Sequence, residues 1–249
     1  MMRSLRCLLM LAALLPAQIS RAQAADDVDL LLVLAVDVSR SIDQAKFLLQ
    51  RDGYAAAVSN RGVLEAIRSG PRQKIGINFV EWSGFGAQKM VIDWTVIDGA
   101  DTARRFGDQI VEAPRSFADR TSISGGIEFA AAQIARSPLR APRQIIDVSG
   151  DGTNNAGRDL GTARDETVAK GIIINGLVIL SDTQVLFNAE HTNPPGGLEK
   201  YYRDNVIGGP GAFVMVAEDF NAFGKAIVKK MIAEIAAAPS PRRRTAWAD

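Results

Sequence analysis

Aspartate, serine and threonine side chains gather in three short segments of the 249-residue chain. Residues 37–41 (DVSRS) form the first segment, residues 119–126 (DRTSISGG) the second and residues 149–155 (SGDGTNN) the third. If the segments meet, two carboxylates and three hydroxyls converge without a nitrogen or sulfur donor. Mg²⁺ prefers such hard oxygen ligands, and two carboxylates balance its charge while part of its octahedron stays open to water or an outside ligand. The segments therefore predict a divalent-cation site.

The elements that would position this site belong to an α/β domain, because short apolar runs alternate with longer amphipathic stretches. The run 28–36 is almost continuously apolar, as in a strand buried on both faces of a parallel sheet. We expect a doubly wound, mostly parallel six-stranded sheet with helices on both faces. The expected strands are 28–36, 74–82, 89–96, 144–148, 171–180 and 212–216.

The short turn at 83–86 favours a hairpin, so one strand at the sheet edge should be antiparallel. Helices are expected at 101–111, 122–136, 160–170, 198–205 and 219–236. A further helix should begin at a capping box formed by residues 41–44 and continue to about Ile67, weakened or broken at Gly53 and Gly62. Ligands of such sheets bind outside the carboxyl ends of the strands, so the three polar segments are expected at one rim.

The first 24 residues resemble a secretory signal peptide. Arg3 and Arg6 precede an apolar run from residue 7 to about residue 15, and Ala22-Gln23-Ala24 provides small residues for cleavage after Ala24. The run is too short to span a bilayer, and no later run reaches the roughly 20 residues that spanning requires. We expect a signal peptide at 1–24, a domain at 25–237 and a disordered basic tail at 238–249, with the mature protein periplasmic or secreted.

Charge and cysteine content exclude several classes of protein. Lysine and arginine number 29 against 28 acids, and cleavage would remove three arginines and no acid, which changes the formal net charge from +1 to −2. This balance argues against nucleic-acid binding driven by phosphate neutralisation. The chain has 1 Cys and 1 His, which excludes a disulfide scaffold and a zinc site with paired histidines or cysteines.

The order of the polar residues resembles the metal-ion-dependent adhesion site of von Willebrand factor type A domains. The matching elements are Asp37-x-Ser39-x-Ser41, Thr121 in a segment that opens a helix, and Asp151 followed by glycine at the end of an apolar strand. The resemblance covers about residues 28–236 and implies a Rossmann-like fold. It also implies that Ser39, Ser41 and Thr121 supply hydroxyl ligands, and that Asp37 and Asp151 bind Mg²⁺ or Mn²⁺ directly or through water. A Glu or Asp carboxylate of a protein partner would complete the shell.

The competing class is an enzyme. A serine hydrolase is disfavoured because no Gly-x-Ser-x-Gly occurs and the single histidine lies in a Pro/Gly-rich connection. Asp37 also resembles the nucleophile of haloacid-dehalogenase-type phosphatases, but Ser39 stands where that family places a second Asp. We therefore expect a non-catalytic binding module, with a metal-dependent phosphatase using Asp37 as the alternative. The partner and the oligomeric state are left open.

Several residues near these segments have two interpretations. Asp147 interrupts an apolar strand, so it either needs a structural hydrogen-bonding partner or joins the ligands. Asp119 either supports the site or does not contribute, while Asn155 is expected to fix its own loop. His191 is expected to be a loop residue outside the site. The long connection 181–211 suggests a functional elaboration or a lid, in which two tyrosines either contact a partner or pack a short helix.

Overall fold

The computed structural model describes residues 27–180 and 189–237. The expected signal peptide and C-terminal tail lie outside the described residues. Six strands form one sheet in the order β3-β2-β1-β4-β5-β6, and only the β2–β3 pair is antiparallel. This confirms the expected sheet with its antiparallel edge strand. The strands are β1 (Leu31–Asp37), β2 (Ile75–Trp82), β3 (Gln88–Ile97), β4 (Gln144–Gly150), β5 (Ile173–Ile179) and β6 (Val214–Ala217).

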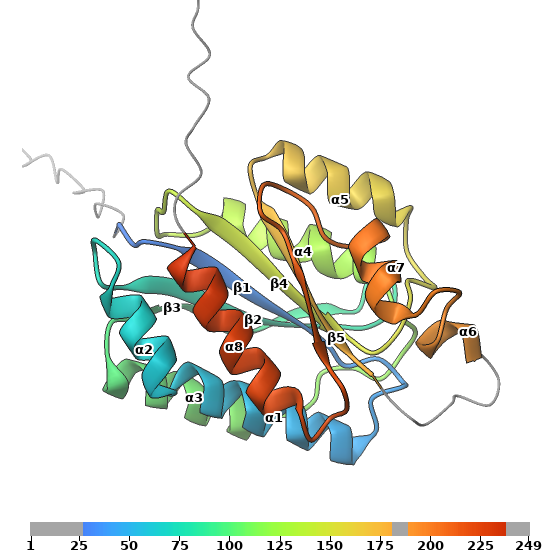
Figure 1. The fold of residues 1–249 in the computed structure, drawn as a ribbon, viewed down its shortest axis with the longest axis horizontal. Helices are drawn as coiled ribbons and strands as arrows, with labels where there is room; N and C mark the ends of the chain where they lie inside the picture. The colour runs from blue at the N-terminus through green and yellow to red at the C-terminus, as the bar shows by residue number, and fades with distance from the viewer. Residues whose placement is uncertain (1–26, 181–188, 238–249) are drawn as a thin grey trace, which may run out of the picture.

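Helices cover both faces of the sheet, as Figure 1 shows. The side chains of β1 alternate between two apolar cores, because successive residues of a strand point to opposite faces. Leu32 and Leu34 pack with one helical layer, and Leu31 and Val33 with the other. The first layer contains α1 (Gln44–Val58), α2 (Arg61–Arg68), α3 (Ala100–Glu112) and α8 (Phe223–Ala236). The second contains α4 (Ile123–Ala135), α5 (Leu160–Ala169) and α7 (Leu198–Asn205).

The expected capping box at Ser41 is wrong. Helix α1 is capped by Asp43, whose side chain accepts a hydrogen bond from the backbone N–H of Lys46 at 2.9 Å. Helix α1 ends at Val58 rather than at a glycine. A new helix starts there because Asn60 caps α2, its side chain accepting from the backbone N–H of Gly62 at 2.8 Å. Ser41 is thereby free to contact another part of the chain.

Gly53 lies inside α1 and serves packing instead of ending the helix. A Cβ atom at this position would come within 2.6 Å of the Phe223 ring, so the absence of a side chain lets α8 approach α1 closely. The last helix begins at Phe223, four residues later than expected, and Asp219 accepts a hydrogen bond from Ala222 in the turn before it.

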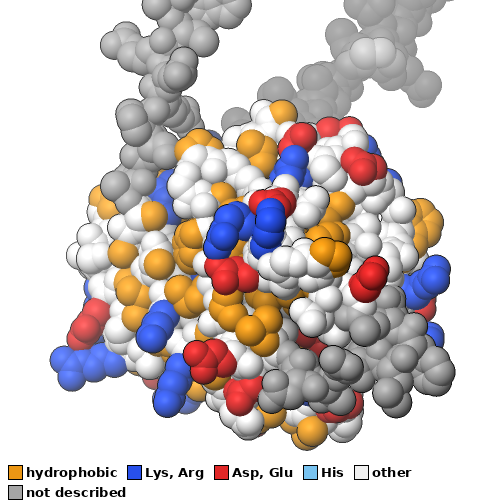
Figure 2. All heavy atoms as spheres, turned by 45° about the vertical axis from the view of Figure 1, so that its right-hand side comes forward, with side chains coloured by type: hydrophobic (Ala, Val, Ile, Leu, Met, Phe, Trp, Pro, Cys, Tyr) orange, Lys and Arg blue, Asp and Glu red, His pale blue; other side chains and the backbone are white. Residues whose placement is uncertain are grey.

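The carboxyl ends of the parallel strands point to the end of the molecule where α6 (Ala189–Thr192) and α7 lie, at the right of Figure 1. Among the described helices, none is long and apolar enough to cross a membrane. On the face turned forward in Figure 2, acidic and basic side chains lie next to one another. This agrees with the balanced composition and shows no extended basic surface on that face.

Candidate metal centre

Four of the five expected site residues are in direct contact at the ends of β1 and β4. Asp37 is the last residue of β1, and Asp151 follows β4, the parallel neighbour of β1. The backbone N–H of Ser39 donates to Asp37 Oδ1 at 2.7 Å, and Ser41 Oγ donates to Asp151 Oδ1 at 2.5 Å. The hydroxyls of Ser39 and Ser41 lie 3.2 Å apart. Strand pairing therefore brings together groups that are more than a hundred positions apart in the sequence.

Thr121 reaches the same rim from the loop before α4. Its backbone N–H donates to Asn155 Oδ1 at 3.0 Å, and its carbonyl accepts from the backbone N–H groups of Asn155 at 2.9 Å and Ala156 at 3.1 Å. These bonds fasten Thr121 to the loop that begins at Asp151. Asn155 thus has the loop-fixing role expected from its position after Asp-Gly.

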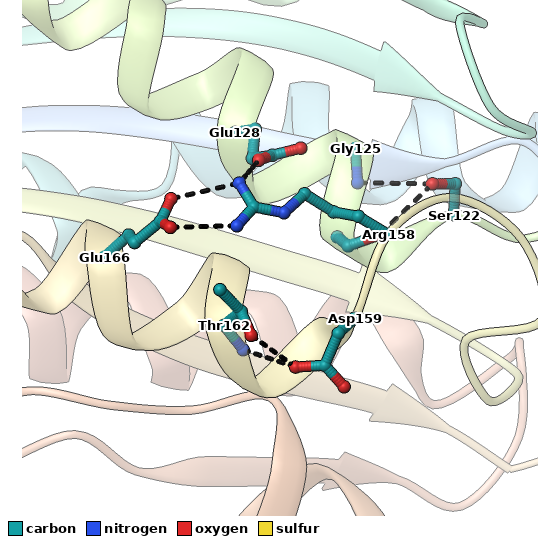
Figure 3. Close-up of polar contacts among 8 residues, drawn as sticks. Ser122, Gly125, Glu128, Arg158, Asp159, Thr162 and Glu166 are labelled. Atoms are coloured by element: carbon teal, nitrogen blue, oxygen red, sulfur yellow. Dashed lines mark hydrogen bonds and ion pairs between the residues drawn. The ribbon is translucent and has the colours of Figure 1, made fainter.

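A network of polar contacts clamps the β4–α5 loop onto α4 (Figure 3). Ser122 caps α4 by accepting from the backbone N–H of Gly125 at 3.2 Å. Arg158 extends from the loop between Glu128 of α4 and Glu166 of α5, with nitrogen–oxygen distances of 2.6 and 2.8 Å. The pairs are partly exposed, so we assign them a positioning role and little stabilisation.

The two site carboxylates are buried and each has an unpaired oxygen. Asp37 is 0% exposed and Asp151 1%, and the Oδ2 atom of each accepts no hydrogen bond from the described residues. Burial and the nearby charge of Asp151 raise the pKa of Asp37 to about 8. Burial also raises the pKa of Asp151, opposed by the hydrogen bond from Ser41 and the charge of Lys46, whose Nζ lies 3.6 Å from Asp151 Oδ2. A cation at this place would relieve both the desolvation and the mutual repulsion.

The donor set fits a divalent cation that accepts hydroxyl ligands. Within 27–180 and 189–237, no three side chains of the His, Cys, Asp and Glu types are grouped so that they could hold a metal by themselves. A cation held by Asp37 and Asp151 would therefore need further ligands, for which the hydroxyls of Ser39, Ser41 and Thr121 are the candidates. The unpaired carboxylate oxygens and the Ser39 and Ser41 hydroxyls beside them are hard donors of the kind that Mg²⁺ and Mn²⁺ accept, and Thr121 offers a third hydroxyl at the same rim.

The expectation that His191 lies outside the site is wrong. Helix α6 places its imidazole Nε2 3.2 Å from Thr121 Oγ1, and the residue is 7% exposed. Burial lowers the pKa of His191, opposed by the charge of Asp151. No local sequence pattern predicts the contact between His191 and Thr121, because the two residues are 70 positions apart. The only signal was the unusual length of the connection that carries His191.

Other ambiguous residues have structural partners. Asp147 forms an ion pair of 2.7 Å with the buried Lys230 of α8, which supports the structural interpretation. Asp119 is exposed and lies 3.9 Å from Arg40. Tyr202 is 0% exposed and packs α7 against the sheet, although its hydroxyl has no hydrogen-bond partner among the described groups.

The fold is that of solved von Willebrand factor type A structures. Proximal thread matrix protein 1 of the mussel byssus, solved with a zinc-occupied MIDAS motif, has 15% identity and a TM-score of 0.55 over 86% of this chain and 49% of its own. The pilus adhesin SpaC of Lactobacillus rhamnosus GG has 12% identity and a TM-score of 0.58, over 86% of this chain and 31% of its own.

A von Willebrand factor type A structure from Catenulispora acidiphila has 12% identity and a TM-score of 0.51, over 84% of this chain and 42% of its own. The chain thus spans about half the length of the mussel protein and about a third of SpaC. At these identities the likeness shows the fold alone.

A search of curated proteins gives no match. A family model described as "Protein of unknown function (DUF1194)" matches residues 27–239, which is nearly the whole described domain. The chain has the von Willebrand factor type A fold and belongs to this DUF1194 family.

Proposed function

We propose that the chain is a non-catalytic binding module that holds a divalent cation, Mg²⁺ or Mn²⁺, and uses it to capture an acidic group of a protein partner. The observation that carries the proposal is the pair of buried carboxylates, Asp37 and Asp151, each with an unpaired oxygen beside serine hydroxyls. Two acids buried next to each other are costly, and the Lys46 ammonium, 3.6 Å from Asp151 Oδ2, carries one positive charge against two negative ones. A bound cation would supply the remaining positive charge.

The neutral and the charged residues of the site would have different roles toward the cation. Ser39, Ser41 and Thr121 offer neutral oxygens, which leave most of the cation's positive charge available to an outside ligand. Asp37 and Asp151, at the carboxyl ends of the buried strands β1 and β4, balance the charge of the cation from the protein side. The cation supplies an open coordination position that a partner carboxylate enters in place of water. Proximal thread matrix protein 1, solved with a zinc-occupied MIDAS motif, supports a metal role for this rim of the fold.

The alternative phosphatase lacks a second acid at the expected position. Ser39 stands there, and its backbone N–H binds Asp37 Oδ1. SpaC is described as a pilus adhesin, and a further structure of similar fold, PilB of Streptococcus sanguinis, with 14% identity and a TM-score of 0.55, as a minor pilin. Both descriptions support a binding role over catalysis. These relatives also support export, and we propose that residues 1–24 direct the chain to the periplasm or outside the cell. N-terminal sequencing of the protein from these fractions should find Ala25 first.

The proposal is tested by titrating Mg²⁺ and Mn²⁺ into the metal-free chain in a calorimeter, and then titrating peptides that carry Glu or Asp. Matched peptides with Gln or Asn are the control for the carboxylate. We expect the cation-loaded chain to bind the acidic peptides and not the Gln or Asn peptides. This binding should be lost in EDTA and in Asp37→Ala. Peptide binding that persists in EDTA would refute cation-mediated capture. Turnover of a phosphate ester that vanishes in Asp37→Asn but survives Ser39→Ala would favour the phosphatase.

A further inference from the structure

His191 is fixed at the edge of the candidate metal centre by contacts on several sides. Its Nε2 lies 3.2 Å from Thr121 Oγ1, and its Nδ1 lies 3.2 Å from Thr153 Oγ1 and 3.4 Å from Asn155 Nδ2. The carbonyl of His191 also accepts from the backbone N–H of Thr153 at 2.9 Å. The ring is therefore oriented by groups other than Thr121.

Gly152 leaves room for the His191 imidazole because it has no side chain. A Cβ atom at this position would come within 2.3 Å of His191 Nε2 and 2.4 Å of Cε1, so the ring lies directly against the glycine that follows Asp151. A larger residue at 152 would push the ring away from the rim. His191, Thr121 and the Asp151 loop are thus packed as one unit.

The contact at Nε2 has a consequence for the Thr121 hydroxyl. Two groups compete for Nδ1: Thr153 Oγ1 at 3.2 Å can accept from a protonated Nδ1, whereas Asn155 Nδ2 at 3.4 Å can only donate to an unprotonated one. The shorter contact favours a protonated Nδ1 that donates to Thr153 Oγ1, and Nε2 then accepts a hydrogen bond from the hydroxyl of Thr121. A hydroxyl that donates a hydrogen bond to His191 has its oxygen lone pairs pointing away from the ring. The hydrogen bond also makes that oxygen a better electron-pair donor to a cation. Outer partners orient metal ligands in this way in many sites.

We infer that His191 is a positioning residue for the metal centre: its Nε2 accepts a hydrogen bond from the Thr121 hydroxyl and so directs the lone pairs of the Thr121 oxygen toward the cation. This inference rests on the proposed function and adds a residue to it. It also gives a role to the described part of the connection, residues 189–211, because α6 brings the one histidine of the chain to the rim. Residues 181–188 lie outside the described residues. Metal affinity would then depend on where α6 lies.

The test measures Mn²⁺ affinity by calorimetry for the full chain purified without a polyhistidine tag. His191→Ala should weaken Mn²⁺ binding about 10- to 100-fold, the usual effect of losing an outer partner of a ligand. His191→Gln, which retains an acceptor oxygen, should recover part of the loss. In a Thr121→Val background, His191→Ala should have no further effect, because the hydroxyl that His191 orients is gone.

Tyr201→Phe is the matched control from the same connection. It removes the hydroxyl that accepts from the backbone N–H of Asn154 at 3.1 Å and does not involve the Thr121 hydroxyl. We expect it to bind Mn²⁺ as the parent chain does. Melting curves of the metal-free variants separate loss of affinity from loss of fold.

Other outcomes overturn the inference. Unchanged Mn²⁺ affinity in His191→Ala, or an equal loss in the Thr121→Val background, would show that His191 does not act through the hydroxyl. A directly coordinated histidine nitrogen in electron spin-echo spectra of bound Mn²⁺ would make it a ligand instead, and the assignment is unambiguous because the chain has 1 His. Absence of Mn²⁺ binding in the parent chain would refute the proposed function together with this inference.

Discussion

Asn155 accepts a hydrogen bond from the backbone N–H of Thr121 at 3.0 Å and returns one from its own backbone N–H to the Thr121 carbonyl at 2.9 Å. Asp151 belongs to the same loop as Asn155, just past the end of β4. This reciprocal pair therefore sets where Thr121 stands relative to Asp151. Geometry within the site depends on a side chain that would not itself bind the cation.

Asn155→Ala should weaken Mg²⁺ and Mn²⁺ binding by about 10- to 100-fold, since the backbone N–H of Thr121 loses its acceptor and only the two bonds to the Thr121 carbonyl remain. Calorimetric titration measures the affinity. Asn60→Ala is the control, because Asn60 also accepts from a backbone N–H, at 2.8 Å, but caps α2 outside the site. It should lower the free energy of unfolding by about 1 kcal/mol and leave metal affinity unchanged. Equal affinities in the two variants would contradict the positioning role of Asn155.

Lys46→Met should strengthen divalent-cation binding. The Lys46 ammonium lies 3.6 Å from Asp151 Oδ2 with its side chain 15% exposed, so it competes with a cation for that carboxylate. Removing the repulsion should improve the binding free energy by about 1 kcal/mol at low salt, and by less as salt screens the charges. Lys170→Met, an exposed change between α5 and the amino end of β5, should have no effect, because the site lies at the carboxyl ends of the strands. Weaker binding in Lys46→Met would show that Lys46 supports the site.

The buried strands and the rim of polar residues were predictable because each has a local pattern. The continuous apolar run of β1 identifies a strand covered on both faces, and parallel strands place Asp37 and Asp151 at the same edge. Four of the five expected site residues accordingly touch one another.

The parts that sequence reasoning missed depend on contacts between distant segments. Ser41 resembles a helix cap, but its hydroxyl binds Asp151, which is 110 positions away. Gly53 resembles a helix breaker, yet it lies within α1 because Phe223 packs against it. His191 reaches Thr121 through a long connection without periodicity, so neither propensity nor spacing could place it.

Glu81→Ala should strongly destabilise the fold. Glu81 Oε1 pairs with Arg51 Nη2 at 2.5 Å, with exposed fractions of 0% and 3%, and Glu81 Oε2 accepts from the backbone N–H of Ser116 at 2.8 Å. The substitution leaves a buried guanidinium without its charge partner, with the Ile110 carbonyl still accepting from Nη1, so we expect a loss of about 3–5 kcal/mol in the free energy of unfolding.

Urea denaturation measures this loss, and Glu65→Ala is its control. Glu65 pairs with Arg61 on the surface of α2, where both side chains are more than half exposed. Its removal should change stability by no more than about 0.5 kcal/mol. Similar effects of the two substitutions would contradict the distinction between buried and exposed pairs.

A second buried cluster joins α8 to the sheet. Lys230 Nζ lies 2.7 Å from Asp147 Oδ1 and 2.5 Å from Glu234 Oε1, and Asn175 donates to Glu234 Oε1 at 2.9 Å. Arg143 approaches from the β4 side and donates to the Glu234 carbonyl. Two buried acids thus share one lysine, and burial, followed by the charge of Asp147, raises the pKa of Glu234 to about 7.

Stability should therefore fall as pH rises between the ordinary value of the Glu234 carboxyl, near 4.5, and its folded pKa of about 7. The folded chain binds the extra proton in this window, so each pH unit removes at most about 1.4 kcal/mol of the Glu234 contribution. Glu234→Gln mimics the protonated acid and should lose this slope. Urea denaturation of both proteins at about pH 5 and about pH 8 compares the two, since groups outside the Asp147–Lys230–Glu234 cluster titrate equally in parent and variant. Between about pH 5 and about pH 8, the free energy of unfolding of the parent should fall relative to that of Glu234→Gln. Parallel pH profiles of this free energy would show that Glu234 does not titrate in this window.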